Sequence, residues 1–169
     1  CSVHAQSYEG KGENEEAINM PGCIEALRAL RQDGHELFLV SFCGDRRAQN
    51  TARYLKPLDL FHRLFFVKHR GYKADICRFL GLDVLIDDRS DILKTIAPTQ
   101  TLQFLSDGRE PEPEAYKCKK TGRMIKTMPF RADWTCTSWA DVLQQVPHIK
   151  ALGLQPDNTV PWQTLCYRT

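Results

Sequence analysis

"DVLIDDRSDIL", residues 83–93, is a short apolar run that ends in two adjacent carboxylates, Asp87 and Asp88. Two like charges side by side repel each other and are costly to remove from water. A divalent cation at the end of the run would offset that cost, because carboxylate oxygens are ligands that Mg²⁺ prefers. The alternative is that Asp88 or Asp91 caps a helix that begins near Ser90.

Apolar runs on both sides of this stretch alternate with amphipathic segments of helical period. That alternation is typical of βαβ units, which build a parallel sheet covered by helices on both faces. The predicted fold class is therefore α/β, a Rossmann-like three-layer sandwich, with the carboxyl ends of its strands on one ligand-binding edge. The predicted strands are 36–42, 64–67, 83–87 and 101–105, and the predicted helices lie within 19–34, 45–55, 73–81, 90–97 and 138–146.

Capping residues mark the ends of two of these helices. The first helix is expected to take Asn19 as its cap, with Pro21 in its first turn, and to stop at Gly34. The last core helix, 138–146, is expected to take Ser138 as its cap.

Three segments lie outside the alternation. Residues 1–18 are predicted to be an exposed polar loop, 106–137 a long loop or a hairpin that turns at "KKTGR", and 147–169 a C-terminal tail without assigned structure. Residues 1–146 are therefore expected to form a single domain. The aromatic residues of 106–134 and 147–169 either wrap back over an open sheet edge or form a patch that docks a protein partner.

Composition limits the class of protein. The chain has 169 residues, of which 42% are hydrophobic and 26% charged, as in one soluble globular domain. Its formal net charge of +2 gives no strong signal for nucleic acid, and local Lys and Arg clusters are interpreted as solvated helix faces. No run of about 18 apolar residues is present, so a membrane-spanning helix is not expected.

The seven cysteines are scattered, and none forms a CxxC pair, so a zinc site or a thioredoxin-like motif finds little support. Cys23 and Cys77 fall on predicted helix faces, where cysteine acts as a small hydrophobe. A reducing, intracellular and cytoplasmic location is the simplest interpretation.

Polar residues fall where consecutive strands finish. Ser41 ends the run "ELFLVSF" and is followed by a sharp "CGD" turn, and Lys73 opens the helix that leads to the acidic pair. A hydroxyl and an ammonium bind phosphate by hydrogen bond and charge, so these residues predict a phosphate-and-magnesium site. Two alternatives are open: Ser41 ties down its strand end and Lys73 is a solvated lysine, or a cation among residues 68–70 takes the place of Lys73.

In this order the motifs resemble the haloacid dehalogenase (HAD) superfamily, especially its deoxyribonucleotidase-like small phosphatases. The resemblance covers residues 19–105. Motif II of that superfamily, a Ser or Thr that ends a strand, matches Ser41; motif III, a lysine, matches Lys73; and motif IV, an acidic pair, matches Asp87 and Asp88. By resemblance, the phosphate-binding residues are Ser41, Cys43, Gly44 and Lys73, and the ligands of Mg²⁺ are Asp87 and Asp88.

Motif I of the superfamily, DxDx[TV], has no match here. In the superfamily its first Asp is the nucleophile that becomes an aspartyl-phosphate, and its second is the general acid and base. The opening residues, "CSVHAQSYEG", contain no Asp, and the chain begins at Cys1 rather than Met. Either motif I precedes residue 1, or the protein has lost it. The retained acidic pair favours the first explanation.

The resemblance implies a Mg²⁺-dependent phosphomonoester hydrolase that acts on a nucleotide or another small phosphate ester. Deoxyribonucleotides are the family-level expectation. The alternative is a catalytically inactive HAD-like module that binds or scaffolds. A small or absent cap is expected, because residues 44–71 are filled by a helix and a strand. The family's strand order would place 83–87 on one side of the missing first strand and 36–42 on the other.

Overall fold

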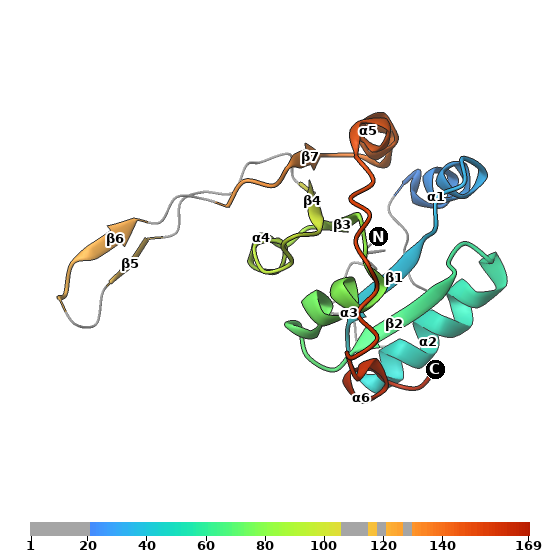
Figure 1. The fold of residues 1–169 in the computed structure, drawn as a ribbon, viewed down its shortest axis with the longest axis horizontal. Coiled ribbons are helices and arrows are strands. Elements are labelled where there is room, and N and C mark those ends of the chain that lie inside the picture. Colours follow the sequence, from blue (N-terminus) through green and yellow to red (C-terminus); the bar gives the residue numbers. More distant parts are fainter. Residues whose placement is uncertain (1–20, 106–114, 118–120, 127–129) are drawn as a thin grey trace.

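The computed structural model describes residues 21–105, 115–117, 121–126 and 130–169 (Figure 1). The predicted polar loop 1–18 and the predicted cap Asn19 lie outside the described residues. Helices and strands alternate along most of the chain, and their bounds are α1 Cys23–Gln32, β1 Phe38–Phe42, α2 Asp45–Leu55, η1 Lys56–Leu58, β2 Arg63–Val67, α3 Tyr72–Leu80, β3 Val84–Asp87, α4 Ser90–Leu93, β4 Gln100–Phe104, β5 Ala115–Lys117, β6 Met124–Lys126, β7 Trp134–Cys136, α5 Trp139–Gln145, η2 Val146–His148 and α6 Trp162–Leu165.

The parallel strands form two groups. β1 pairs with β2, and β3, β4 and β7 pair in that order, all in parallel. Among the described strands, β1 and β3 do not pair with each other, and no strand pairs with both of them. The central sheet is therefore present as two half-sheets, β1-β2 and β3-β4-β7, on either side of the position where the resemblance places another strand.

Successive residues of the strands point to opposite faces and meet different helices. Leu39 packs against α2 whereas Val40 packs with α3. In β3, Ile86 packs with α1 and α5, whereas Leu85 packs with α3 and α4. Helices α1, α2 and α5 thus cover one face and α3 and α4 the other, which confirms the predicted three-layer α/β fold with parallel strands.

Two predicted helices differ from the structure at their ends. α1 begins at Cys23, after Gly22 with φ 76°, so neither Asn19 nor Pro21 is in the helix. A left-handed residue cannot continue a right-handed helix, and glycine adopts that conformation without steric cost. α4 stops at Leu93 rather than continuing towards Pro98. Thr95 there donates its hydroxyl to the carbonyl of Ile92, 2.7 Å away, in the turn that follows.

The segment after β4 contains a strand that hydrophobic periodicity did not reveal. β7 pairs with β4 over three residues only, too few to show a period of two. The Asp133 carboxylate anchors its start by accepting hydrogen bonds from the backbone N–H and hydroxyl of Thr101, at 2.7 and 2.9 Å. β5 and β6 pair antiparallel on either side of the "KKTGR" turn and extend away from the body of the molecule (Figure 1).

α5 has the predicted Ser138 cap, in the form of a capping box. Ser138 Oγ accepts from the backbone N–H of Asp141 at 3.1 Å, and the Asp141 carboxylate accepts from the backbone N–H of Ser138 at 3.0 Å. Trp139 and Val142 of this helix are buried against α1 and β4. The helix therefore closes the outer end of the second half-sheet.

The C-terminal tail crosses from α5 to the far edge of β2 (Figure 1). Cys166 forms an antiparallel bridge with Val67, and Trp162 lies edge-on to Phe65 with ring centroids 5.6 Å apart. Trp134 packs at the margin of the core around α1 and α5. Both tryptophans thus make contacts within the chain, and the tail covers part of the open edge of β2. A protein partner at these segments stays a prediction.

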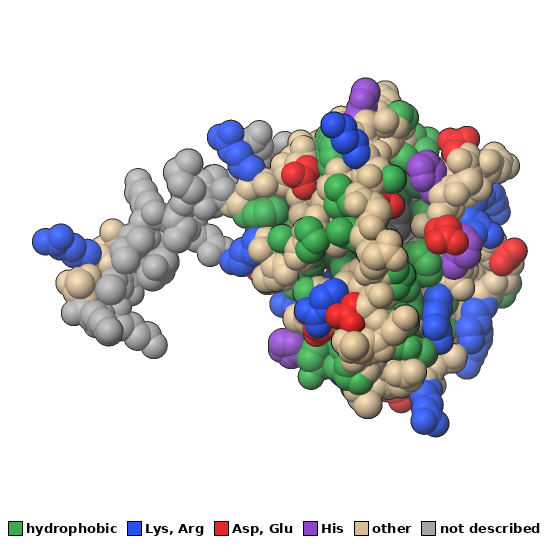
Figure 2. All heavy atoms as spheres, viewed as in Figure 1, with side chains coloured by type: hydrophobic (Ala, Val, Ile, Leu, Met, Phe, Trp, Pro, Cys, Tyr) green, Lys and Arg blue, Asp and Glu red, His purple; other side chains and the backbone are tan. Residues whose placement is uncertain are grey.

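Lys and Arg side chains gather on the side of the molecule where α2 lies (Figure 2). Ala48, Ala52 and Leu55 of α2 are buried on the opposite side of the helix. This is the solvated helix face that the sequence predicts. No helix in the described part of the chain is long and apolar enough to cross a membrane.

Gly81 provides a test of how closely the tail packs. Its φ is +61°, and a Cβ there would lie 2.5 Å from the carbonyl oxygen of Leu154, whereas Gly153, at φ +62°, has nothing within 4 Å of that position. Both Gly→Ala substitutions should cost about 1–2 kcal/mol of backbone strain. Gly81→Ala should cost about 1–3 kcal/mol more, because tail and helix end must separate. Urea unfolding measures both; equal losses would contradict this packing.

Candidate functional site

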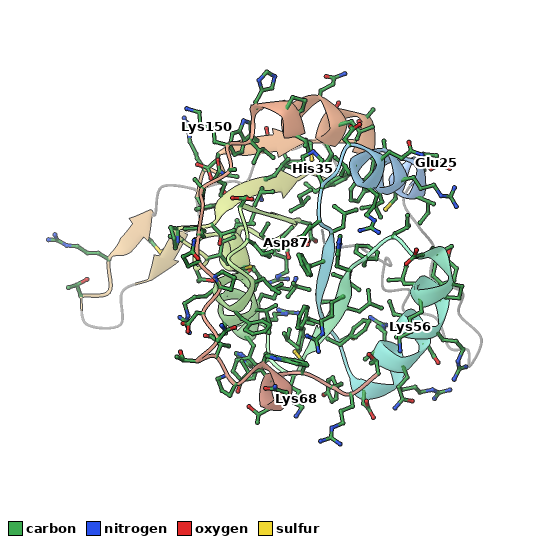
Figure 3. All side chains as sticks on the ribbon, turned by 45° about the vertical axis from the view of Figure 1, so that its right-hand side comes forward. Glu25, His35, Lys56, Lys68, Asp87 and Lys150 are labelled. Atoms are coloured by element: carbon green, nitrogen blue, oxygen red, sulfur yellow. The ribbon has the colours of Figure 1, made fainter. Side chains whose placement is uncertain are left out.

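The carboxyl ends of the strands meet at one edge. Phe42 and Val67, the last residues of β1 and β2, are paired. The loop after β2 leads into α3, where Lys73 Nζ lies 2.5 Å from Oδ2 of Asp87, the last residue of β3. Because Lys73 reaches across from the first half-sheet to the second, the ends of β1, β2 and β3 lie on the same side. Figure 3 shows Asp87 in the interior, between the two halves.

The Lys73–Asp87 ion pair is almost completely buried. Asp87 is 1% exposed and Lys73 5%. Asp87 Oδ1 accepts a hydrogen bond from the backbone N–H of Arg89 at 3.0 Å, so both carboxylate oxygens are engaged. A buried charge without a partner is strongly destabilising, so each of these two residues requires the other. The structure thus brings together two of the residues that the sequence singles out.

The other acidic residues of the opening stretch have different roles. Asp91 binds the Arg89 guanidinium through both oxygens, at 2.9 and 2.8 Å, and the hydrogen bond from Arg89 lowers the pKa of Asp91. α4 has no side-chain cap, so neither Asp88 nor Asp91 serves as one. Asp88 is half-buried, with its Oδ1 atom inside the protein, next to the Lys73–Asp87 pair in sequence. Its role as the second carboxylate of the predicted site stays a prediction.

Ser41 is half-buried near the end of β1, and its side chain hydrogen-bonds the thiol of Cys43. Burial raises the pKa of the Cys43 thiol; the nearby positive charge of Arg47 and the Ser41 hydrogen bond act in the opposite direction. A neutral thiol is a poor nucleophile, so Cys43 does not resemble a catalytic cysteine. Gly44 is exposed and precedes α2 directly. Among the described residues, no hydrogen bond or ion pair joins Ser41 to Lys73 or Asp87.

The three alternative cations are engaged elsewhere. Lys68 Nζ donates to the carbonyl of Thr164 in the tail at 2.9 Å, and His69 Nδ1 accepts from the backbone N–H of Gly71 at 3.1 Å. Arg70 lies over the Phe42 ring, 5.2 Å from its centroid. Lys73 is therefore the cation that reaches the acidic strand end. Sequence reasoning could not choose among these residues, because the choice depends on where the β2–α3 loop turns.

The donor set fits Mg²⁺ in kind but is incomplete. Asp87 and Asp88 offer the oxygen ligands that this ion prefers. Within the described residues, however, no group of three or more His, Cys, Asp or Glu side chains could hold a metal ion. Mg²⁺ in proteins usually keeps several water ligands and is held through one or two carboxylates, so water and substrate phosphate would complete its coordination.

No family model matches the chain, but a curated protein and solved structures are similar to it over part of their length. Over 90 residues, 52% of this chain and 48% of the relative, it is 26% identical to the "Putative nucleotidase" of Oceanobacillus iheyensis. The chain thus spans about half the length of that curated relative. The crystal structure of a "predicted phosphoglycolate phosphatase" from Haemophilus somnus aligns over 76% of this chain and 57% of its own, with a TM-score of 0.49 and 16% identity.

The order of the motif residues, their position at the ends of parallel strands and the nucleotidase relative agree with one another. In these features the chain resembles the HAD superfamily. Between Gly44 and Gly71 the chain contains only α2, η1 and β2, so it carries no inserted cap in that interval.

The mutual dependence of Lys73 and Asp87 can be measured. Asp87→Asn or Lys73→Met alone should lower the free energy of unfolding by about 3–5 kcal/mol, because each leaves a buried charge unpaired. The double substitution should cost clearly less than the sum of the two, since it removes both charges. Chemical denaturation of all four forms gives the coupling energy.

The Arg89–Asp91 pair, with side chains 42% and 45% exposed, is the matched surface control. Arg89→Met should change stability by no more than about 1 kcal/mol. Additive effects of Lys73→Met and Asp87→Asn would show that the two charges are not coupled.

Proposed function

We propose that this HAD-like chain forms the core of a Mg²⁺-dependent phosphomonoester hydrolase that acts on a nucleotide or another small phosphate ester. The observation that carries the proposal is the buried Lys73–Asp87 pair at the carboxyl edge of the parallel strands, beside Asp88 and the strand end that bears Ser41. Burying a cation and carboxylates costs free energy. Buried charged groups of this kind are typical of sites that bind charged ligands such as phosphate and Mg²⁺.

The reacting carboxylate would come from a strand between β1 and β3. Each of these strands has one partner among the described strands, β2 and β4 respectively. A cavity of about 390 Å³ lies at the amino ends of β1 and β3, lined by residues such as Phe38 and Val84. A parallel strand entering there would end between Ser41 and Asp87, where the resemblance requires the aspartate nucleophile.

Each site residue then has a distinct task. The Ser41 hydroxyl would donate a hydrogen bond to a phosphoryl oxygen, and the Lys73 ammonium would offset the negative charge that grows there in the transition state. Asp87 holds Lys73 in position and, with Asp88, would bind the metal. Bound Mg²⁺ would supply further charge neutralisation at the phosphoryl group. The exposed turn at Gly44 leaves room for the phosphate next to the start of α2.

A nucleotide substrate is supported by the printed name of the Oceanobacillus relative. A reducing, intracellular location is supported by the cysteines: the five in the described residues are free and buried. Burial raises the pKa of Cys23, Cys77 and Cys136 to about 12, so these thiols stay protonated.

The second candidate function is a HAD-like module without catalysis. Its motivation is that residues 1–169 contain no D-x-D pattern, whereas motif I of the resembled superfamily supplies the nucleophile. In such a module the Lys73–Asp87 pair would serve only to hold α3 against β3. The two functions differ in turnover and in metal binding, and the next two tests address these in turn.

The complete gene product should hydrolyse at least one member of a panel of nucleoside monophosphates and small aliphatic phosphate esters. Ser41→Ala should lower kcat by about 10²–10³-fold, because it removes one preorganised hydrogen-bond donor to the phosphoryl oxygens. Thr135→Ala removes an exposed hydroxyl from β7 and should leave kcat unchanged. Phosphate release measures both. No turnover of any panel member would favour the scaffold module.

Mg²⁺ binding to the same protein should depend on the acidic pair. Asp87→Asn and Asp88→Asn should each weaken Mg²⁺ affinity by more than about tenfold, because each removes one charge from the ligand set. Asp83→Asn, at the opposite end of the same acidic stretch, is the matched control and should retain the affinity. Calorimetric titration tests all three; unchanged affinity in Asp87→Asn would remove this residue from the metal site.

A further inference from the structure

An exposed aromatic ring lies at the edge of the candidate site. Phe42 is the last residue of β1, directly after Ser41, and it is 41% exposed, whereas Leu39 and Val40 of the same strand are completely buried. The large hydrophobic residues exposed in the described part of the chain are few, and of these Phe42 lies on the edge that carries Ser41, Lys73 and Asp87. Its ring is therefore positioned to touch whatever group is attached to a phosphate bound there.

Arg70 lies over this ring from the neighbouring loop. Its guanidinium carbon is 5.2 Å from the Phe42 ring centroid, a distance at which cation and ring attract each other. The backbone carbonyl of Arg70 accepts a hydrogen bond from the N–H of Lys73 at 3.1 Å, which fixes the start of this side chain relative to the candidate catalytic lysine. The Phe42 ring and the Arg70 guanidinium thus meet because β1 and β2 are neighbours, with Phe42 at the end of β1 and Arg70 in the loop after β2.

Arg70 also lies near one carboxylate of the acidic stretch. Its positive charge contributes to the lowered pKa of Asp91, so the two side chains are near each other. Asp91, however, is bound through both oxygens by Arg89. Among the described residues Arg70 forms no salt bridge, and its guanidinium lies over the Phe42 ring. An exposed guanidinium and an exposed ring are therefore available together.

We propose that Phe42 and Arg70 form a stacking platform for the leaving group, and that the preferred substrates are nucleoside monophosphates, whose planar base lies against this platform. Aromatic side chains and guanidinium planes are the groups on which proteins stack unpaired bases. The platform rests on the proposed function, since it assigns the phosphate to Ser41 and Lys73. It assigns the preference for a nucleotide over other phosphate esters to two residues outside the motif positions.

The test compares two substrates on the complete gene product. For Phe42→Leu, which keeps an apolar side chain but removes the ring, the ratio of kcat/KM for a nucleoside monophosphate to kcat/KM for glycerol phosphate should fall by about 5- to 150-fold, as expected for the loss of one stacked ring. Tyr54, 38% exposed on α2, is the matched aromatic control. Tyr54→Leu should leave that ratio unchanged. An unchanged ratio in Phe42→Leu overturns the platform.

Two substitutions of Arg70 distinguish stacking on its guanidinium plane from the effect of its charge alone. Lysine keeps the charge but lacks the guanidinium plane. Arg70→Lys should therefore lower the substrate ratio nearly as much as Arg70→Met. If Arg70→Lys restores the full ratio while Arg70→Met does not, Arg70 binds a second anionic group through charge, and the platform is wrong.

A binding measurement distinguishes failure of the platform from failure of the hydrolase. The monophosphate of 2-aminopurine riboside loses fluorescence when its base stacks on a ring. Binding to the complete gene product should quench it, and Phe42→Leu should weaken that binding by the same 5- to 150-fold, about the contribution of one stacked base. Quenching without turnover of any ester would support the platform and contradict the hydrolase. Turnover without quenching would support the hydrolase and contradict the platform.

Discussion

The ion pair between Lys73 and Asp87 is the contact on which the arrangement of the two half-sheets depends. One partner comes from the helix that follows β2 and the other from the last residue of β3, so the bond at 2.5 Å spans both groups of strands. Neither charge is accessible to water, and neither could be left without the other. A bond of this kind contributes little net stability compared with a well-packed apolar pair, but it orients a cation and a carboxylate at a defined place. That place is the edge where α/β proteins bind their ligands.

α3 connects the two half-sheets through adjacent residues. Ile76 packs with β1 and β2, whereas Cys77 packs with Leu85 of β3. The C-terminal tail makes a second connection at the opposite end. The Leu152 N–H donates to Asp83 at 2.6 Å and Asp157 forms an ion pair with Arg78, before the tail reaches β2 at Cys166. The ion pair and the tail thus both connect the two groups of strands, and the tail does so through the amino end of β3 and the last residue of β2.

Sequence reasoning found the elements whose residues show a clear period or a clear end. β1, β2, β3 and β4 lie within two residues of the predicted strands, because continuous apolar runs mark strands buried on both faces. The Ser138 cap was predictable because the side chain and its partner Asp141 are three residues apart. β7 was missed because three residues have no measurable period. The predicted start of α1 was wrong, because the left-handed conformation of Gly22, rather than the predicted cap Asn19, determines where that helix begins.

Some features of the candidate site could likewise be predicted from the sequence and others could not. The order of Ser41, Lys73 and the acidic pair is readable along the chain, because each closes or opens an element of the sheet. Which cation reaches Asp87 was not readable, since Lys68, Arg70 and Lys73 differ in sequence by only a few positions and in direction by the turn between them. The exposure of Phe42 gave no signal either, because an apolar residue at the end of an apolar strand is expected to be buried. Motif positions therefore determine the chemistry of such a site. Because the interval between β1 and α3 carries no cap, the proposed platform assigns contact with the leaving group to Phe42, one position after Ser41, and to Arg70, three positions before Lys73.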